Sequence, residues 1–165
     1  MLLNSNQIAN HVIESDFSKR AQIGIDLSVC KIERIDVGSV VYKDKTHIDA
    51  TGYHELPTQL IDNKDCWRLE KGVYSVTFNE GIKVPDNAAA KITHRSSLYR
   101  TGTIIESPWC DPGFYCDQMN TTMIVTSVII IEKNARIGQI AFWKVDEVGE
   151  QYDGQWQGLN TAYKK

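Results

Sequence analysis

The sequence predicts an all-β protein with a short N-terminal helix. After residue 20, short stretches rich in β-branched and aromatic residues recur about every ten residues, and turn-forming residues separate them. The stretches that predict strands are 24–29, 40–42, 72–78, 124–131 and 137–145. Many short strands at this spacing are typical of a sandwich, a jelly roll or a barrel.

The N-terminal segment follows a different period. Ile8, Val12 and Ile13 recur near helical spacing, and Asn4 or Ser5 offers a side-chain cap for the first turn. Further along, the polar segment 43–64 is the expected long surface excursion. No long linker or internal repeat interrupts the sequence, so residues 1–165 are predicted to form a single domain.

Composition and charge exclude several classes of protein. Among the 165 residues, 18 Lys and Arg face 21 Asp and Glu, and no basic run occurs, so nucleic acid is not a predicted partner. No apolar run approaches the ~20 residues of a membrane helix, so no membrane association is predicted. The N-terminus has acidic residues and no apolar signal segment, which predicts a cytoplasmic protein.

The four cysteines show no metal-site spacing. No two of Cys30, Cys66, Cys110 and Cys116 are separated by the two to four residues of a zinc knuckle. In a reducing compartment, unpaired cysteines behave as small buried apolar residues. A nucleophilic Cys110 would need a histidine partner that the sequence does not place. The cysteines are therefore expected to be free thiols, and no metal ligands are predicted.

A polar cluster at 94–100 has the composition of an anion site. It carries the guanidinium groups of Arg95 and Arg100 and the hydroxyls of Ser96 and Ser97. Arginine forks match phosphate oxygens, and serine hydroxyls can complete such a pocket. The alternative is a solvated loop that serines cap.

Three further positions carry candidate chemistry. Asp111 lies in a Pro/Gly turn among aromatic residues, where a carboxylate can deprotonate a water molecule or merely cap its own turn. Gln139 can donate and accept hydrogen bonds, or it is an outward-facing strand residue. The aromatic, glycine-flanked tail 152–158 is either a frayed terminus or a segment that folds over a planar base.

Together these segments resemble the dUTPase and dCTP deaminase superfamily. The stretches 24–27 (GIDL), 95–98 (RSSL), 111–114 (DPGF) and 135–139 (ARIGQ) resemble its first four motifs in order. The tail 152–158 (YDGQWQG) is similar to the closing motif of archaeal-type dUTPases, so the resemblance covers residues 22–158.

The resemblance implies a fold, an assembly and a reaction. Members share a distorted jelly roll, the dUTPase-like β-clip, and form homotrimers whose active sites lie where subunits meet. Asp111 would activate the water molecule that attacks the α-phosphorus of dUTP, releasing dUMP and pyrophosphate. Mg²⁺ would bind through the substrate phosphates, and Asp26 would reach this ion only through water.

The resemblance also implies which residues bind substrate. Arg95, Ser96, Ser97 and Gln139 would hold the triphosphate, and Arg100 would add to them. Phe114 would stack on the deoxyribose. Residues 150–165 would form a flexible tail that closes over the site, with Tyr152, Trp156 and Gln157 at the ligand.

One position favours hydrolysis over deamination. Deaminases of this superfamily carry a glutamate about ten residues after the Asp-Pro-Gly turn, and here Thr121 stands at that place. Neither H-x-E nor P-C-x-x-C occurs, which disfavours a zinc deaminase. Phe114 and the residues after it depart from the usual dUTPase hairpin, so the choice between uracil and cytosine stays open. A dCTP deaminase, a dCTP or mixed dCTP/dUTP pyrophosphatase, a catalytically silent regulator and an unrelated β-sandwich binding module are the alternatives.

Overall fold

The computed structural model describes residues 1–36, 39–41, 43, 46–48, 52–146, 152–154 and 157–158. Its helices are short: α1 (Ser5–Ile8), the 3₁₀ helix η1 (Ala9–His11) and α2 (Ser96–Tyr99). The strands are β1 (Val12–Ile13), β2 (Lys19–Arg20), β3 (Ile25–Ile35), β4 (Ser39–Val41), β5 (Thr46–Ile48), β6 (Tyr53–Glu55), β7 (Gln59–Ile61), β8 (Lys64–Leu69), β9 (Gly72–Phe78), β10 (Gly81–Lys83), β11 (Ala88–His94), β12 (Thr103–Glu106), β13 (Tyr115–Cys116), β14 (Asn120–Val125), β15 (Ile129–Glu132) and β16 (Arg136–Lys144).

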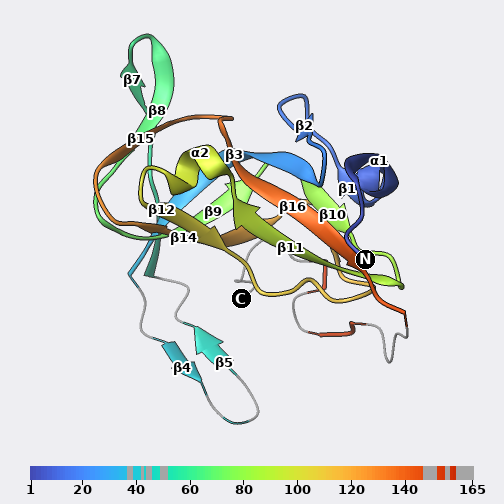
Figure 1. The fold of residues 1–165 in the computed structure, drawn as a ribbon. Coiled ribbons are helices and arrows are strands. Elements are labelled where there is room, and N and C mark those ends of the chain that lie inside the picture. Colours follow the sequence, from blue (N-terminus) through green and yellow to red (C-terminus); the bar gives the residue numbers. More distant parts are fainter. Residues whose placement is uncertain are drawn as a thin grey trace.

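The largest sheet closes on itself (Figure 1). Its strands run in the order β16-β11-β12-β14-β9-β3-β2, and β16 also pairs with β3. The ring β16-β11-β12-β14-β9-β3 is therefore continuous, which removes the free edges that an open sheet would expose. This barrel-like jelly roll confirms the all-β prediction.

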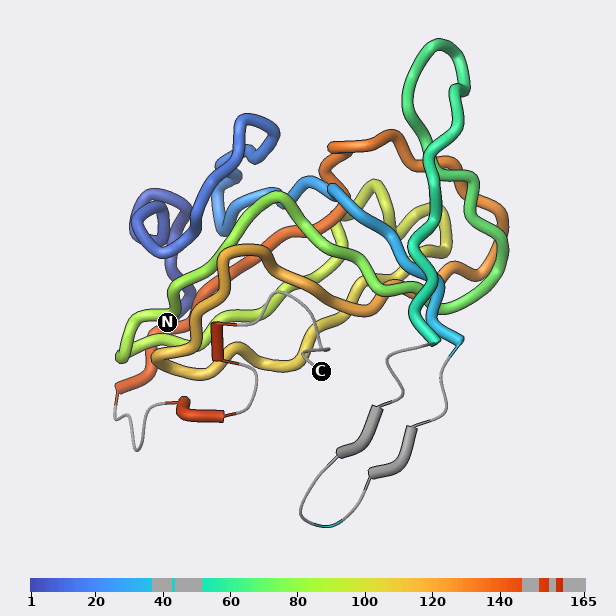
Figure 2. The backbone as a smooth tube through the Cα atoms, turned by 180° about the vertical axis from the view of Figure 1, so that it is seen from behind, coloured from blue at the N-terminus to red at the C-terminus, as the bar shows by residue number. Residues whose placement is uncertain are grey.

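Three smaller sheets flank the barrel. They are β1-β10-β13, β15-β8-β7 and β4-β5. The β7–β8 hairpin projects from the body in two opposite views (Figures 1 and 2). Its turn residues Asp62 and Asn63 both have positive φ, as a tight hairpin turn requires.

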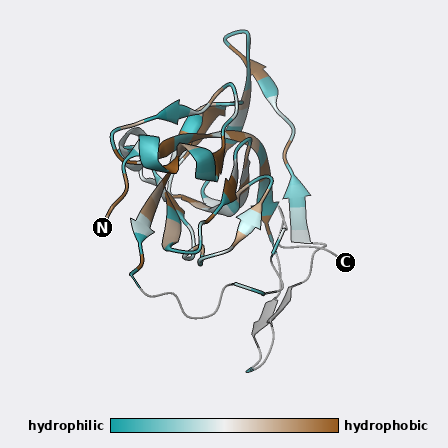
Figure 3. Ribbon diagram, turned by 90° about the vertical axis from the view of Figure 1, so that its right-hand side faces the viewer, coloured by the Kyte–Doolittle hydropathy of each residue, from teal (hydrophilic) through white to brown (hydrophobic). Residues whose placement is uncertain are grey.

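The barrel interior holds the core. Along β16 the residues alternate between buried and less buried positions, and Ile140 and Phe142 are fully buried. Residues of β3 and β9, such as Leu27 and Phe78, complete the same cluster. Hydrophobic stretches accordingly run along the barrel strands in Figure 3. A Cβ at Gly138 would lie 2.9 Å from the Phe78 ring, so glycine is needed there for close packing.

The predicted N-terminal helix is confirmed as α1. Asn4 is the cap, since its side chain accepts hydrogen bonds from the backbone N–H groups of Asn6 and Gln7. The Gln7 side chain in turn accepts from the Asn4 N–H, which completes a capping box. The predicted strand 72–78 is β9.

One expectation about element boundaries was wrong. The apolar run 124–131 is not one strand, because β14 pairs with β9 in the barrel whereas β15 pairs with β8 in another sheet. The chain changes sheets between them, where the Thr126 hydroxyl bonds the Gly102 carbonyl. The segment 43–64 carries β5, β6 and β7, and its β7–β8 hairpin projects from the body (Figure 1).

Candidate functional site

The first strand of the site begins at a glycine that admits no side chain. Gly24 has φ +94°, and a Cβ there would lie 2.3 Å from the backbone oxygen of Ile140. This close approach lets β3 pair with β16, and the register places Asp26 opposite Gln139. The 24–27 and 135–139 motifs therefore meet because the barrel closes between them.

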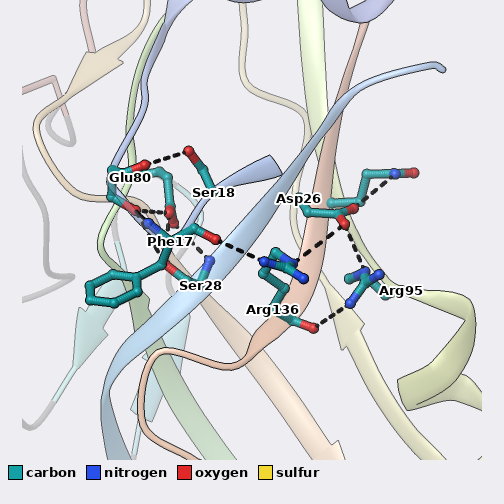
Figure 4. Close-up of polar contacts among 9 residues, drawn as sticks. Phe17, Ser18, Asp26, Ser28, Glu80, Arg95 and Arg136 are labelled. Atoms are coloured by element: carbon teal, nitrogen blue, oxygen red, sulfur yellow. Dashed lines mark hydrogen bonds and ion pairs between the residues drawn. The ribbon is translucent and has the colours of Figure 1, made fainter. Parts of the chain in front are cut away.

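Asp26 is the centre of a buried polar cluster. Its carboxylate forms an ion pair with Arg95, whose Nε lies 3.0 Å away, and accepts a hydrogen bond from Gln139 Nε2 at 3.2 Å. Arg136 Nε lies 4.0 Å away (Figure 4). The Asp26 side chain is only 6% exposed, so these cationic and amide donors compensate a charge that water cannot reach.

An open pocket of about 570 Å³ lies beside this cluster. Three of the four motifs contribute to it, and its lining is Lys19, Arg20, Ala21, Gln22, Asp26, His94, Arg95, Ser96 and Gln139. The Arg95 guanidinium also donates from Nη1 to the Arg136 carbonyl, so its orientation is fixed from two sides. The structure thus brings together Asp26, Arg95, Ser96 and Gln139.

Helix α2 separates Arg95 from Arg100. Arg95 is its extended N-cap, and Ser96 and Ser97 form its exposed first turn. Arg100 lines a second shallow pocket of about 690 Å³ with Ser96, Tyr99, Gly102, Ile104 and Thr126. Arg100 is therefore adjacent to the Arg95 pocket through Ser96, whereas Ser97 lines neither pocket.

Asp111 lies in a different part of the subunit. The turn is closed by the backbone, since the Phe114 N–H donates to the Asp111 carbonyl at 3.1 Å and Gly113 has φ +82°. The Asp111 side chain is exposed, and it makes no hydrogen bond or ion pair with another described residue. Its carboxylate is not used to cap the turn and is available for chemistry.

The strand β11 separates Asp111 from Arg95. Ala90 and Cys110 exchange two backbone hydrogen bonds of 2.9 and 2.7 Å near the start of this strand, whereas Arg95 follows its end. Five residues of extended chain span about 17 Å at a rise of ~3.4 Å per residue. The Arg95 side chain is turned toward Asp26, so the chain by itself does not bring Asp111 to the pocket.

The described part of the tail packs on the Asp111 hairpin. The Tyr152 N–H donates to the Pro112 carbonyl at 2.9 Å, and the Tyr152 ring meets Phe114 edge to face at 5.5 Å. The Gln157 amide bonds the backbone of Tyr115 and Gly113. Trp156 lies outside the described residues. Phe114, Tyr152 and Gln157 thus gather at Asp111 and not at Arg95.

The cysteines are free thiols. Burial, with a smaller effect of the Asp111 charge, raises the pKa of Cys110 to about 12. Burial likewise raises the pKa of Cys116 to about 12. Since a thiolate is the nucleophilic form, this environment disfavours a nucleophilic Cys110.

Thr121 cannot serve as a general acid or base. It is buried on β14, and its hydroxyl donates to the Glu106 carbonyl at 2.7 Å. A hydroxyl fixed in this way takes no part in proton transfer near neutral pH.

Sequence reasoning missed three cationic residues near the pocket. Lys19 and Arg20 line it, and Arg136 flanks Asp26. The basic pair Lys19 and Arg20, separated from the 24–27 motif by three residues, was the available signal for the first two. Among the described residues, no group of three or more His, Cys, Asp or Glu side chains could hold a metal ion, and no helix is long and apolar enough to cross a bilayer.

The profile of dCTP deaminase-like proteins matches residues 4–145 of the chain. The chain belongs to this family. Within it, the chain is 33% identical to a probable deoxyuridine 5'-triphosphate nucleotidohydrolase of Methanosarcina acetivorans, over 97% of this chain and 98% of the relative. It is also 33% identical to the deoxyuridine 5'-triphosphate nucleotidohydrolase of Methanocaldococcus jannaschii, over 96% of this chain and 99% of the relative.

Solved structures share the family fold. The 2'-deoxycytidine 5'-triphosphate deaminase of Agrobacterium tumefaciens superposes with a TM-score of 0.64 and 16% identity, over 86% of this chain and 46% of that one. The EIAV dUTPase superposes with a TM-score of 0.50 and 15% identity, over 88% of this chain and 96% of that one.

Proposed function

We propose that this family member is a dUTP diphosphatase that hydrolyses dUTP to dUMP and pyrophosphate. The observation that carries the proposal is the convergence of Asp26, Arg95, Ser96 and Gln139 on one pocket rich in cations and hydrogen-bond donors. Such a pocket suits a phosphate chain. The archaeal relatives that match nearly the whole chain carry the dUTPase name, which supports uracil nucleotide as the substrate.

Asp111 is the proposed general base. Its exposed carboxylate, which pairs with no other described residue, would take a proton from water as the water oxygen attacks the α-phosphorus. The bond from that phosphorus to the bridging oxygen of pyrophosphate then breaks. Arg95, Ser96, Ser97 and Gln139 would hold the phosphate groups, and Arg100 would add a second guanidinium. Phe114 would pack against the deoxyribose.

Mg²⁺ fits this site as an ion that the substrate carries. The Asp26 carboxylate is already engaged in an ion pair with Arg95 and a hydrogen bond from Gln139, so it would contact such an ion through a water molecule. Bound to phosphate oxygens, Mg²⁺ would neutralise part of their charge. The contacts of Asp26 hold Arg95 and Gln139 in place.

We further propose that the enzyme is a homotrimer with shared sites. Asp111 follows Cys110, which pairs with Ala90 near the start of β11, whereas Arg95 follows the end of that strand. A complete site therefore needs Asp111 from one copy and Arg95 from its neighbour. An exposed apolar row supports such contact. Val73, Ile124 and Ile104 lie side by side across β9, β14 and β12, and each is more than a third exposed.

A deaminase of the same family is the second candidate, because the matching profile is described as dCTP deaminase-like. Thr121, fixed to the Glu106 carbonyl, argues against it. A dCTP or mixed dCTP/dUTP pyrophosphatase would use the same pocket. A silent regulator is disfavoured by the retained Asp111, Arg95 and Gln139.

One assay separates these candidates. The protein is incubated with Mg²⁺ and either dUTP or dCTP, and pyrophosphate and ammonia are measured together. We expect pyrophosphate from dUTP and no ammonia from dCTP. Ammonia release would identify a deaminase and overturn the proposal. Pyrophosphate from dCTP but not from dUTP would identify a dCTP pyrophosphatase. No product from either nucleotide would indicate a regulator.

A further inference from the structure

We infer that Lys19 is a further phosphate-binding residue, contacting the part of the substrate that leaves as pyrophosphate; this inference rests on the proposed function. Lys19 on β2 is directly opposite Asp26 on β3. Side chains at such paired positions stand on the same face of a sheet, about 5 Å apart at Cβ. The Lys19 ammonium therefore belongs to the face where Asp26 meets Arg95 and Gln139, and both Lys19 and Asp26 line the pocket.

The Lys19 charge has no partner in the described part of the chain. The other cations of the pocket lining are engaged: Arg20 pairs with Glu14 at 2.8 Å, and Arg95 pairs with Asp26 at 3.0 Å. The carboxylate contributed to the lining by Asp26 is already shared with Arg95 and Gln139. Lys19 thus leaves uncompensated positive charge in the pocket, which an anion would neutralise.

The segment that carries Lys19 is held in place by buried contacts. Glu80 is fully buried and accepts hydrogen bonds from the Ser15 hydroxyl and from the backbone N–H of Ser28. The Ser15 hydroxyl also accepts from the Phe17 N–H, and the Ser18 hydroxyl donates to the Ser15 carbonyl.

A second anchor joins this segment to the Asp26 cluster. Arg136 Nη1 donates to the Phe17 carbonyl at 3.4 Å, and the same guanidinium faces Asp26. Figure 4 shows Arg136 between Phe17 and Asp26, with Glu80 and Ser28 beside Phe17. The Ala21 N–H donates to the Gly24 carbonyl at the other end. The backbone of Lys19 is therefore fixed at the pocket rim, which lowers the entropy cost of binding an anion there.

The position of Asp111 decides which phosphates Lys19 contacts. The reacting α-phosphorus must lie near the Asp111 carboxylate, and Asp111 is not part of the Lys19 pocket. The pocket can then hold the β- and γ-phosphates, which leave together as pyrophosphate. Lys19 should accordingly bind both intact substrate and inorganic pyrophosphate.

The test compares three single variants with the parent enzyme. Lys19→Gln removes the charge and Lys19→Arg keeps it. Lys64→Gln removes a lysine that pairs with Glu132 on β15 and does not line the pocket. We expect Lys19→Gln to raise KM for dUTP about tenfold, to weaken inhibition by pyrophosphate about as much, and to change kcat less than about twofold, as loss of one charge-assisted contact predicts. Lys19→Arg should recover most of the parental KM and most of the parental pyrophosphate inhibition, and Lys64→Gln should match the parent.

Equal KM and equal pyrophosphate inhibition in Lys19→Gln and the parent would overturn the inference. Calorimetric binding of inorganic pyrophosphate keeps the inference separate from the proposed function. If the parent fails to hydrolyse dUTP, the proposed function fails. Tighter pyrophosphate binding by the parent than by Lys19→Gln still supports the assignment of Lys19, whereas equal binding, or none by either protein, refutes it.

Discussion

Gln157 and Tyr115 are joined through a side chain and a backbone amide: the Tyr115 N–H donates to Gln157 Oε1 at 3.1 Å. Gln157 Nε2 donates to the Gly113 carbonyl at 2.8 Å, and the Gly158 N–H donates to the Tyr115 carbonyl at 2.9 Å. Tyr115 lies on β13, the edge strand of its sheet. The tail therefore satisfies edge groups that would otherwise face water.

The first prediction concerns this contact. Gln157→Ala should release the tail from the hairpin and raise the hydrogen-exchange rate of the Tyr115 amide about tenfold or more, because about 1.4 kcal/mol of protection corresponds to that factor. Gln118→Ala is the control, since Gln118 is a nearby amide that contacts Cys30 and not the tail. Unchanged exchange at Tyr115 in Gln157→Ala would mean that this contact does not hold the tail.

The second prediction concerns Glu80, a buried carboxylate that the reaction does not use. Glu80→Ala leaves the Ser28 N–H and hydroxyl and the Ser15 hydroxyl without their acceptor. We expect it to lower the free energy of unfolding by about 2–4 kcal/mol, measured by urea denaturation. The exposed Glu55 supplies the control Glu55→Ala, which should stay within about 0.5 kcal/mol. A Glu80→Ala protein as stable as the parent would show that these bonds contribute little.

The sequence predicted the local elements better than their long-range partners. Asn4 and the apolar spacing after it predicted α1, and the β-branched and aromatic residues of 72–78 predicted β9, because both signals lie within a few residues. The split of 124–131 was not predictable, since β14 and β15 differ only in the strands with which they pair. The site followed the same rule. The motifs indicated Asp26, Arg95 and Gln139, whereas Lys19 joins them only through the β2–β3 register.

The third prediction follows from the raised pKa of Cys110. The folded state holds the thiol proton up to about pH 12, whereas an exposed thiol loses it near its ordinary pKa of 9.0. The stabilising contribution is therefore complete below pH 9 and is lost as pH rises toward 12. Urea denaturation should show stability falling over this range, with a shallower fall in Cys110→Ala. At pH 7.5, iodoacetamide should label Cys110 slowly and leave dUTP hydrolysis intact. Rapid labelling with loss of hydrolysis would indicate a reactive thiol.

The last prediction tests Asp111 and the shared site together. Asp111→Asn keeps the size of the side chain and the turn bond to the Phe114 N–H, which comes from the backbone carbonyl. It should lower pyrophosphate release at least ~100-fold while nucleotide binding survives. Asp62→Asn, in the exposed turn of the projecting β7–β8 hairpin, should leave the rate unchanged.

Arg95→Met should also be inactive, since it removes the guanidinium that faces the pocket. Suppose that each site combines Asp111 of one subunit with Arg95 of the next. A trimer that contains both inactive variants, in either a 2:1 or a 1:2 composition, then has one complete site. Unfolding the two proteins together and refolding them at equal concentration should therefore restore about a quarter of parental activity, because about three quarters of randomly assembled trimers are mixed and each has one working site of three. Light scattering checks that all samples are trimers. Mixed trimers that stay inactive would show that Asp111 and Arg95 do not act across a subunit contact.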